Sequence, residues 1–358
     1  MDFSFWKDKN VFLTGHTGFK GSWLSLWLQQ LGANVTGYSL GPPTTPSLFE
    51  LAGVNDHMAS VFGNICDKSH LRKTMLTCKP EIVIHMAAQP LVRMSYLDPV
   101  NTFETNVIGT VNILEVARHT PSVKAIVNVT TDKCYENKEW IWGYKEQDRL
   151  GGHDPYSSSK ACAELISSSY RDSFFNSSNS NIALATARAG NVIGGGDWAK
   201  DRLMTDLISA LQKDEEVEIR NPNATRPWQH VLEPLRGYLM LAERLYLDGH
   251  KYSEPWNFGP REQDVKSVSW IVNELSSHWK KAKVSNRIGS HPHEAQSLKL
   301  DISKAKARLG WSPFFCVKEA ISLTADWSIK LQKGISAKDI TVDQIISYQK
   351  LLKLNEQS

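Results

Sequence analysis

The chain has 358 residues, 41% hydrophobic and 22% charged, and its 41 basic and 38 acidic residues leave a formal net charge of +3. This near balance argues against a nucleic-acid-binding or membrane-surface protein, and no apolar run reaches the ~18 residues that a membrane span needs. Five scattered cysteines without a C-x-x-C pair fit neither a disulfide framework nor a thiolate zinc site. We therefore expect a cytoplasmic protein that binds neither nucleic acid, membrane nor metal.

Short β-branched runs alternate with helical segments through the first half of the chain. The predicted strands are Val11–Thr14, Asn34–Tyr38, Ala59–Phe62, Ile82–His85, Ala125–Val129 and Ala183–Ala187. The predicted helices are an apolar stripe from Leu24 to Leu31 and the segments Thr102–His119, Ser157–Phe175 and Leu232–Leu247. This alternation is typical of an α/β, doubly wound (Rossmann-like) parallel sheet, which binds ligands at the carboxyl ends of its strands.

The regular alternation stops after about Asn191, where glycine- and proline-rich turns punctuate the chain. We predict a dinucleotide-binding domain over residues 1–190, to which residues 232–262 return. Residues 191–231 and 263–358 are predicted to form a smaller, interleaved substrate lobe over the carboxyl edge of the sheet.

A glycine-rich turn directly follows the first predicted strand. It reads Gly15-His16-Thr17-Gly18-Phe19-Lys20-Gly21 and opens the next helix. Glycines let the backbone turn tightly and approach a pyrophosphate, toward which a helix N-terminus directs unpaired N–H groups. Glycines also collect in ordinary loops, but the position between first strand and first helix favours a dinucleotide.

The end of the second strand bears on the choice of cofactor. The sequence Tyr38-Ser39-Leu40-Gly41 contains neither an acid for the adenosine ribose hydroxyls nor an arginine for a 2′-phosphate. We choose NAD over NADP. After the fourth strand, Ala87, Ala88 and Gln89 permit close approach of a cofactor, or equally serve packing.

Tyr156 and Lys160 stand four residues apart on one face of a helix that Pro155 begins. A free tyrosine has a pKa of about 10 and is a poor base at neutral pH. A lysine ammonium one turn away and a positive nicotinamide ring both favour the phenolate. A lone Tyr-x-x-x-Lys pattern is commonly surface decoration, but behind a dinucleotide motif it predicts catalysis and contact with the cofactor.

Three polar residues, Thr131, Asp132 and Lys133, follow the fifth predicted strand, where a doubly wound sheet places its chemistry. The Thr131 hydroxyl has the reach to bridge a substrate oxygen and Tyr156. The alternative is a solvated charged turn.

The ordered set of these motifs resembles the extended short-chain dehydrogenase/reductase superfamily, and within it the nucleotide-sugar 4,6-dehydratases, nearest to the branch that acts on CDP-glucose. Supporting stretches are 85–93, 188–198 and 225–231. In this superfamily the positions of Asn64 and Ile65 often touch adenine, although Asn64 is as readily a polar turn residue.

The resemblance implies dehydration of a CDP-glucose-like substrate to a 4-keto-6-deoxy sugar for deoxysugar (O-antigen type) biosynthesis, with a tightly held NAD. Tyr156 would take the proton from the 4-hydroxyl, and a protonated Asp132 would donate to the departing 6-hydroxyl. Lys133 stands where many such enzymes have the glutamate that takes the C5 proton. An ammonium, with its usual pKa of about 10.4, must be depressed by burial or nearby cations to do so.

The diphosphate would be clamped by Arg226, possibly with Arg202, since planar two-pronged donors suit phosphate oxygens. Asn191 would contact sugar or phosphate, and Arg93 is added as a substrate-binding or supporting residue. An interlobe salt bridge and a capping asparagine are the alternatives. The cluster His291-Pro292-His293-Glu294 is too tightly spaced for a metal site, and we reject that interpretation.

Three other functions compete with the leading one. A nucleotide-sugar 4-epimerase shares the fold, NAD, Tyr156 and Lys160 but has no need for Asp132 and Lys133. A dehydratase of a dTDP-, GDP- or UDP-sugar differs only in a base pocket that the sequence does not reveal. A non-catalytic NAD-binding scaffold predicts decay of the Tyr/Lys pair, which is intact. We expect a homodimer formed through the two long helices, or a homotetramer.

Overall fold

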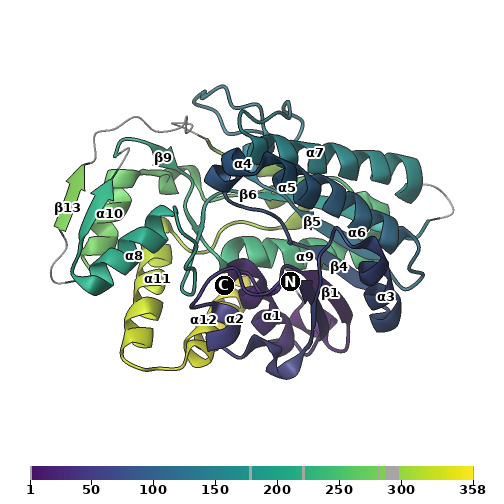
Figure 1. Cartoon of the computed structure of the whole chain (residues 1–358), viewed down its shortest axis with the longest axis horizontal. Coiled ribbons are helices and arrows are strands. Elements are labelled where there is room, and N and C mark those ends of the chain that lie inside the picture. The colour runs from purple at the N-terminus through teal and green to yellow at the C-terminus, as the bar shows by residue number, and fades with distance from the viewer. Residues whose placement is uncertain (1, 177–179, 220–221, 280–282, 287–297, 358) are drawn as a thin grey trace.

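A computed structural model describes residues 2–176, 180–219, 222–279, 283–286 and 298–357. Seven parallel strands form one sheet in the order β11-β6-β5-β4-β1-β2-β3 (Figure 1). Their bounds are β1 Asn10–Thr14, β2 Asn34–Ser39, β3 Ala59–Phe62, β4 Ile82–His85, β5 Ala125–Val129, β6 Ala183–Ala189 and β11 Pro255–Phe258. The strand order reverses between β1 and β4, which is the doubly wound arrangement, and the predicted fold class is confirmed.

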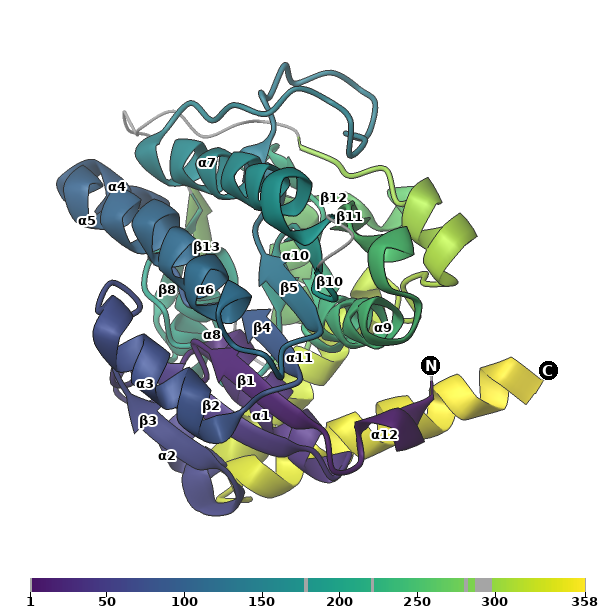
Figure 2. The ribbon, with the colours of Figure 1, turned by 90° about the vertical axis from the view of Figure 1, so that its right-hand side faces the viewer.

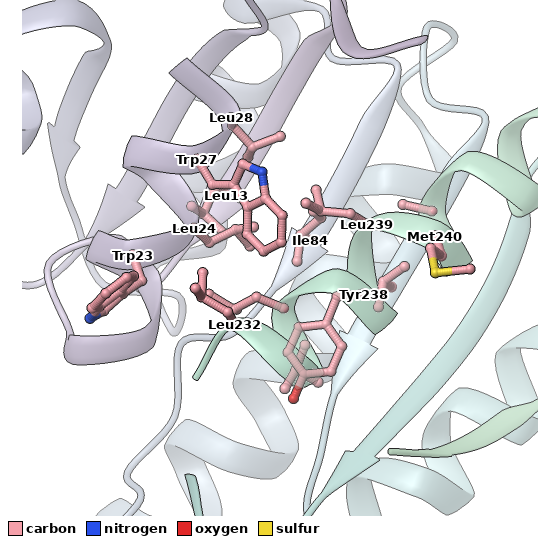
Figure 3. Packing of buried hydrophobic residues seen from close by; sticks show 14 of the residues in the cluster. Leu13, Trp23, Leu24, Trp27, Leu28, Ile84, Leu232, Tyr238, Leu239 and Met240 are labelled. Carbon is pink, nitrogen blue, oxygen red and sulfur yellow. The ribbon is translucent and has the colours of Figure 1, made fainter. Parts of the chain in front are cut away.

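Helices cover both faces of the sheet (Figure 2), so successive apolar residues of the central strands point to opposite faces and both are buried. Leu13 and Ile84 pack against helices α1 (Phe19–Gln30) and α9 (Leu232–Asp248), as Figure 3 shows. Their neighbours Phe12 and Val83 face the opposite cluster, which contains side chains of α3 (Lys68–Cys78) and α6 (Gly109–Arg118). Burial on both faces is typical of a parallel sheet.

The two long predicted helices are helical throughout, with a local irregularity in each. The first comprises α5 (Pro99–Phe103), a π-helical segment (Glu104–Ile108) and α6, and the second comprises α7 (Pro155–Tyr170) and a π-helical segment at Arg171–Phe175. The strand β11 lies outside the predicted set. It opens on a proline and has no β-branched residue, so its sequence carries little strand signal.

A smaller group of elements lies beyond the carboxyl edge of the sheet, on the left in Figure 1. Its paired strands are β7 (Val192–Ile193) with β10 (Gln229–His230), β8 (Glu216–Ile219) with β13 (Lys283–Asn286), and β9 (Thr225–Arg226) with β12 (Lys266–Ser267). Its helices are α8 (Leu203–Lys213), α10 (Val268–Ser276) and α11 (Val317–Gln332). They share their own core around Leu207, Ile271 and Ile321.

The last helix, α12 (Ala337–Gln357), packs against α1, where the rings of Trp27 and Tyr348 lie 5.8 Å apart edge to face. The division into two lobes stays a prediction, and this contact is a reason to count α12 with the sheet. The shorter helical segments are Phe3–Trp6, α2 Leu48–Leu51, Val54–His57, α4 Val92–Leu97, Asp132–Cys134, Gly249–Tyr252, Glu262–Asp264 and Ala305–Leu309. Over the described residues, we find no helix with the length and apolar character to cross a bilayer.

Candidate active site

The glycine-rich turn joins β1 to α1 and depends on two close backbone approaches. Gly15 has φ +77°, and a Cβ there would lie 2.8 Å from the backbone nitrogen of Ala87. A Cβ on Gly21 would lie 2.0 Å from the carbonyl oxygen of Gly15. Gly18 caps α1 without a side-chain hydrogen bond, and the helix begins at Phe19. The first N–H groups of α1 are therefore open to an anion, and this cradle fits a pyrophosphate.

Thr17 and Asn64, two other residues predicted to bind the cofactor, make hydrogen bonds that hold neighbouring loops in place. The Thr17 hydroxyl lies 2.8 Å from the Ser39 hydroxyl and donates to the carbonyl of Leu40. The side-chain oxygen of Asn64 accepts a hydrogen bond from the backbone of Cys66 at 2.9 Å, which is its turn role. Their contact with a cofactor stays a prediction.

The loop after β4 is held in the same way. The backbone nitrogen of Ala87 donates to the hydroxyl of Thr14, and Ala88 follows it half-buried. The Gln89 side chain is hydrogen-bonded within its own loop and to α5. Ile65 is buried in the core beside α6. The polar groups of these residues are engaged within the fold, so their contribution to the site is its shape.

The helix α7 presents Tyr156 and Lys160 at the end of β5. The Tyr156 hydroxyl is hydrogen-bonded with Thr131, and the Lys160 ammonium donates to the carbonyl of Val129 at 3.3 Å. Burial raises the pKa of Tyr156 to about 12 and lowers the pKa of Lys160 to about 8. In the chain alone, burial thus outweighs the lowering of the Tyr156 pKa that the sequence suggests, and a further positive charge is required to make this tyrosine a base.

Asp132 is fully enclosed beside this pair. Its carboxyl accepts a hydrogen bond from the Thr131 hydroxyl at 3.1 Å. Burial raises its pKa, although Lys133, the Thr131 hydroxyl and Arg226 oppose the rise. A Cβ on Gly190 would lie 2.8 Å from the carboxyl oxygen, so only glycine permits this approach. Burial therefore shifts Asp132 toward its protonated form, which is the form that can donate.

Two groups that the sequence analysis did not assign to the reaction lie at the same place. The Lys20 ammonium sits 5.7 Å from the ring centre of Tyr238 on α9, and burial with the charges of Lys160 and Arg202 lowers its pKa to about 7. The buried Tyr238 hydroxyl has no hydrogen-bond partner among the described residues and points away from the apolar cluster in Figure 3. Asp132 lies within electrostatic reach of both.

The predicted substrate-binding residues come from the smaller group of elements and from α4. Arg226 lies on β9, and its charge reaches Asp132. Asn191 follows β6, and its backbone carbonyl accepts from Gln229 at 3.1 Å. These two positions border the cluster of Tyr156 and Asp132.

The other two arginines are engaged in ion pairs. Arg202 precedes α8 and lies 2.6 Å from Asp197, and its charge reaches Tyr156. Arg93 on α4 lies 2.7 Å from Asp201, an ion pair that fits a supporting role for Arg93. Of the two, Arg202 is the better placed for a diphosphate.

In the described part of the chain, we find no group of three His, Cys, Asp or Glu side chains that could hold a metal ion. The sequence cluster His291–Glu294 lies outside the described residues. His85 at the end of β4 is buried, with Nδ1 2.7 Å from the Thr14 hydroxyl, and burial lowers its pKa to about 3. It is a neutral structural histidine.

Comparison with known proteins gives the site its chemical setting. The model of the GDP-mannose 4,6 dehydratase family matches residues 12–324. A CDP-glucose 4,6-dehydratase of Salmonella typhimurium is 54% identical over 331 residues, which are 91% of this chain and 92% of that protein. The human dTDP-D-glucose 4,6-dehydratase is 25% identical, over 89% of each chain.

Solved structures agree in fold. A UDP-glucose 4-epimerase of Thermotoga maritima with UDP-glucose aligns with a TM-score of 0.78 at 22% identity, covering 90% of this chain and 99% of that one. A dTDP-glucose 4,6-dehydratase of Bacillus anthracis in complex with NAD aligns with a TM-score of 0.74 at 20% identity, covering 91% and 98%. The resemblance stated from the motifs is confirmed, and the chain belongs to the GDP-mannose 4,6 dehydratase family.

Proposed function

We propose that this protein is a CDP-glucose 4,6-dehydratase that converts CDP-D-glucose to CDP-4-keto-6-deoxy-D-glucose with NAD. The observation that carries the proposal is the buried Asp132, whose pKa is raised and which shares the Thr131 hydroxyl with Tyr156. An acid in its protonated form is what the loss of the 6-hydroxyl as water requires. The 54% identity to a CDP-glucose 4,6-dehydratase supports the choice of nucleotide.

The site residues act on protons at named atoms. Bound NAD, held at the glycine-rich turn, would supply the hydride chemistry, by which C4 is oxidised and C6 later reduced. Tyr156, as phenolate, takes the proton of the 4-hydroxyl, and Lys160 stabilises that phenolate. The C4 ketone makes the C5 proton acidic. Lys133, acting as the neutral amine, takes this proton and gives a proton back to C5 when C6 is reduced. Asp132 gives its proton to the 6-hydroxyl, which departs as water.

The residues at the glycine-rich turn fit this cofactor. The cradle of Gly15, Gly18 and Gly21 leaves space and unpaired N–H groups for its pyrophosphate. The cationic group of Lys20, Lys160 and Arg202 suits the phosphates of cofactor and substrate. The positive nicotinamide ring is also the further charge that Tyr156 needs to act as a base.

The experiment follows isotopes through the reaction. Purified protein is incubated with CDP-[4-²H]glucose in water and with unlabelled CDP-glucose in deuterated water. Transfer of deuterium from C4 to C6 in the first, and solvent deuterium at C5 in the second, are expected. CDP-galactose formed without loss of water would instead identify a 4-epimerase. Turnover of only another nucleotide sugar would show that the enzyme prefers a nucleotide other than CDP.

The variant Asp132→Asn tests the assigned acid. It cannot donate the proton that water loss needs, so formation of the 6-deoxy product falls by about 100-fold or more. Oxidation at C4 survives, and quenched samples contain CDP-4-ketoglucose by mass spectrometry. The control Asp326→Asn removes an exposed carboxylate that pairs with Lys330, and it keeps full activity. Equal rates in both variants would contradict the role of Asp132.

Two further parts of the proposal concern the setting of the enzyme. We propose that two copies pair through an exposed apolar face of α4 to α7. The face is made by Leu97, Val100, Phe103, Ile108 and Leu165. We also place the enzyme in the cytoplasm, and its five free cysteines support a reducing compartment.

A further inference from the structure

A buried carboxylate one turn beyond Lys160 has no part in the steps above. Glu164 on α7 is 3% exposed and accepts three hydrogen bonds. They come from the Thr130 hydroxyl at 2.5 Å, the Thr186 hydroxyl at 2.7 Å and the Arg188 guanidinium at 2.8 Å. Because every donor is buried with it, this carboxylate is held in one position.

The guanidinium of Arg188 extends the network from β6 toward the catalytic turn. It donates to the Tyr135 hydroxyl at 2.7 Å and to the carbonyl of Glu146 at 3.1 Å. The Tyr135 hydroxyl in turn donates to Asn257 on β11 at 2.7 Å. One guanidinium thus connects α7, β6 and the segment that directly follows Asp132–Cys134.

The groups that face Lys160 differ in charge. Lys20 approaches from α1, His85 from β4 and Cys134 from the turn after β5. His85 is neutral because burial lowers its pKa to about 3, and Cys134 stays a thiol because burial raises its pKa. Glu164 has a lowered pKa and is the anion in this group. Glu164 lies one turn from Lys160 on α7, and the two side chains contact consecutive residues at the end of β5, Val129 for Lys160 and Thr130 for Glu164. At this place its charge raises the pKa of Lys160 against the effect of burial.

We propose that Glu164 is a positioning residue that keeps Lys160 in its ammonium form beside Tyr156. Arg188 is the second member of this device, because it fixes the carboxylate of Glu164 in place. The inference rests on the proposed function, in which the Lys160 ammonium stabilises the Tyr156 phenolate. Without the anion, Lys160 would share one dry site with Lys20 and a positive cofactor ring, and Lys160 would lose its proton more readily.

The test measures the protonation of Lys160 directly. The full-length protein is labelled with ¹³Cε-lysine, and the Lys160 signal is assigned by its absence in Lys160→Met. In Glu164→Gln we expect its titration midpoint to fall from about 8 by about one pH unit, the size of a charge interaction one helical turn away. The high-pH limb of kcat falls by the same amount, while KM for CDP-glucose changes little.

The double variant Glu164→Gln/Arg188→Met separates this role from a structural one. A neutral pair of similar volume removes the unpaired buried cation, so the fold is retained even where Glu164→Gln alone unfolds. The lower midpoint persists in the double variant if Glu164 acts by its charge. A midpoint restored to the wild-type value would overturn the proposal and leave Glu164 a structural residue.

The matched control is Glu233→Gln. Glu233 is as deeply buried, on α9, and accepts from the Tyr348 hydroxyl at 2.8 Å, but it does not face Lys160. It is expected to lower stability and leave the Lys160 midpoint unchanged, and an equal shift in this variant would also overturn the proposal. The midpoint is read without turnover, so a wild type that fails to dehydrate CDP-glucose contradicts the proposed function and not the positioning role.

Discussion

Burial moves the pKa values of Asp132 and Tyr156 in the same direction, and the consequence for the two residues is opposite. Asp132 is shifted toward the protonated form in which it donates, while Tyr156 is held back from the phenolate in which it accepts. The chain alone thus favours the acid and disfavours the base. In the proposed function, the positive nicotinamide ring would favour the base, which would couple proton removal to the presence of cofactor.

Buried histidines make the protein sensitive to acid. Burial lowers the pKa of His85 and of His230 to about 3 and that of His16 to about 4. The unfolded chain binds protons below its usual histidine pKa near 6.5 and the folded chain does not, so stability is lost as pH falls from about 6.5 toward about 4. Each histidine takes about 1.4 kcal/mol from the free energy of unfolding per pH unit over this range.

Urea unfolding at a series of pH values checks this prediction. In His230→Phe, the ring contacts with Trp23 and Phe315 are kept while the titrating group is removed. The fall of the unfolding free energy with acid is then about one third shallower in its histidine part. An unchanged slope would show that carboxylates alone determine the acid limit.

At the scale of the element, the turn between β1 and α1 has no space for an added atom at Gly15 or Gly21. In Gly21→Ala the new methyl group would meet the carbonyl of Gly15 at 2.0 Å, and the turn must open. We expect NAD affinity to fall by about 100-fold or more, since the cradle loses its N–H geometry. Isothermal titration with NAD measures it. Gly41→Ala has nothing within 4 Å of the added carbon and keeps wild-type affinity; a similar loss there would contradict the steric argument.

How much of the site the sequence reveals depends on how local each signal is. The glycine-rich turn and the Tyr156/Lys160 pair are visible because their partners are a few residues away. Glu164 and Arg188 are not, since 24 positions separate them and only the pairing of β5 with β6 beside α7 joins them. Lys20 is visible as a loop residue, but its approach to Tyr238 depends on how α9 packs.

Irregular elements escape for a similar reason. The predicted strands of the sheet recur within a residue or two, because each is a compact apolar run. The strand β11 and the π-helical segments at Glu104–Ile108 and Arg171–Phe175 depend on neighbours that lie far away in the sequence. The loop roles of Thr17 and Asn64 likewise follow from which backbone groups the fold brings within reach.

At the scale of the whole molecule, the exposed apolar face of α4 to α7 predicts a dimer. Leu97 is 77% exposed and Val100 66% exposed, and both lie where α4 and α5 flank α7 (Figure 2). Such a surface on helices is the kind that a second copy covers. We expect light scattering after gel filtration to give a dimer mass for the wild type. The double variant Leu97→Glu/Val100→Glu should give a monomer, because two charges would be buried against their own copies.

The control for the effect of added charge is the pair Leu351→Glu and Leu354→Glu on α12. These variants add the same charges at exposed positions away from this face. These variants should keep the dimer. A wild type that elutes as a monomer would remove the face from the proposal without touching the assignment of the active site.

The chain passes from the sheet to the smaller group of elements after β6, returns with α9 and β11, and leaves again through β12 before α12 ends against α1. Neither the sheet with its helices nor the smaller group of elements is therefore one contiguous stretch of sequence. Recombination at any single point would leave one half missing a strand or a helix. A change of substrate preference by point substitutions in the loops avoids this constraint, whereas exchange of the smaller group of elements would need more than one crossover.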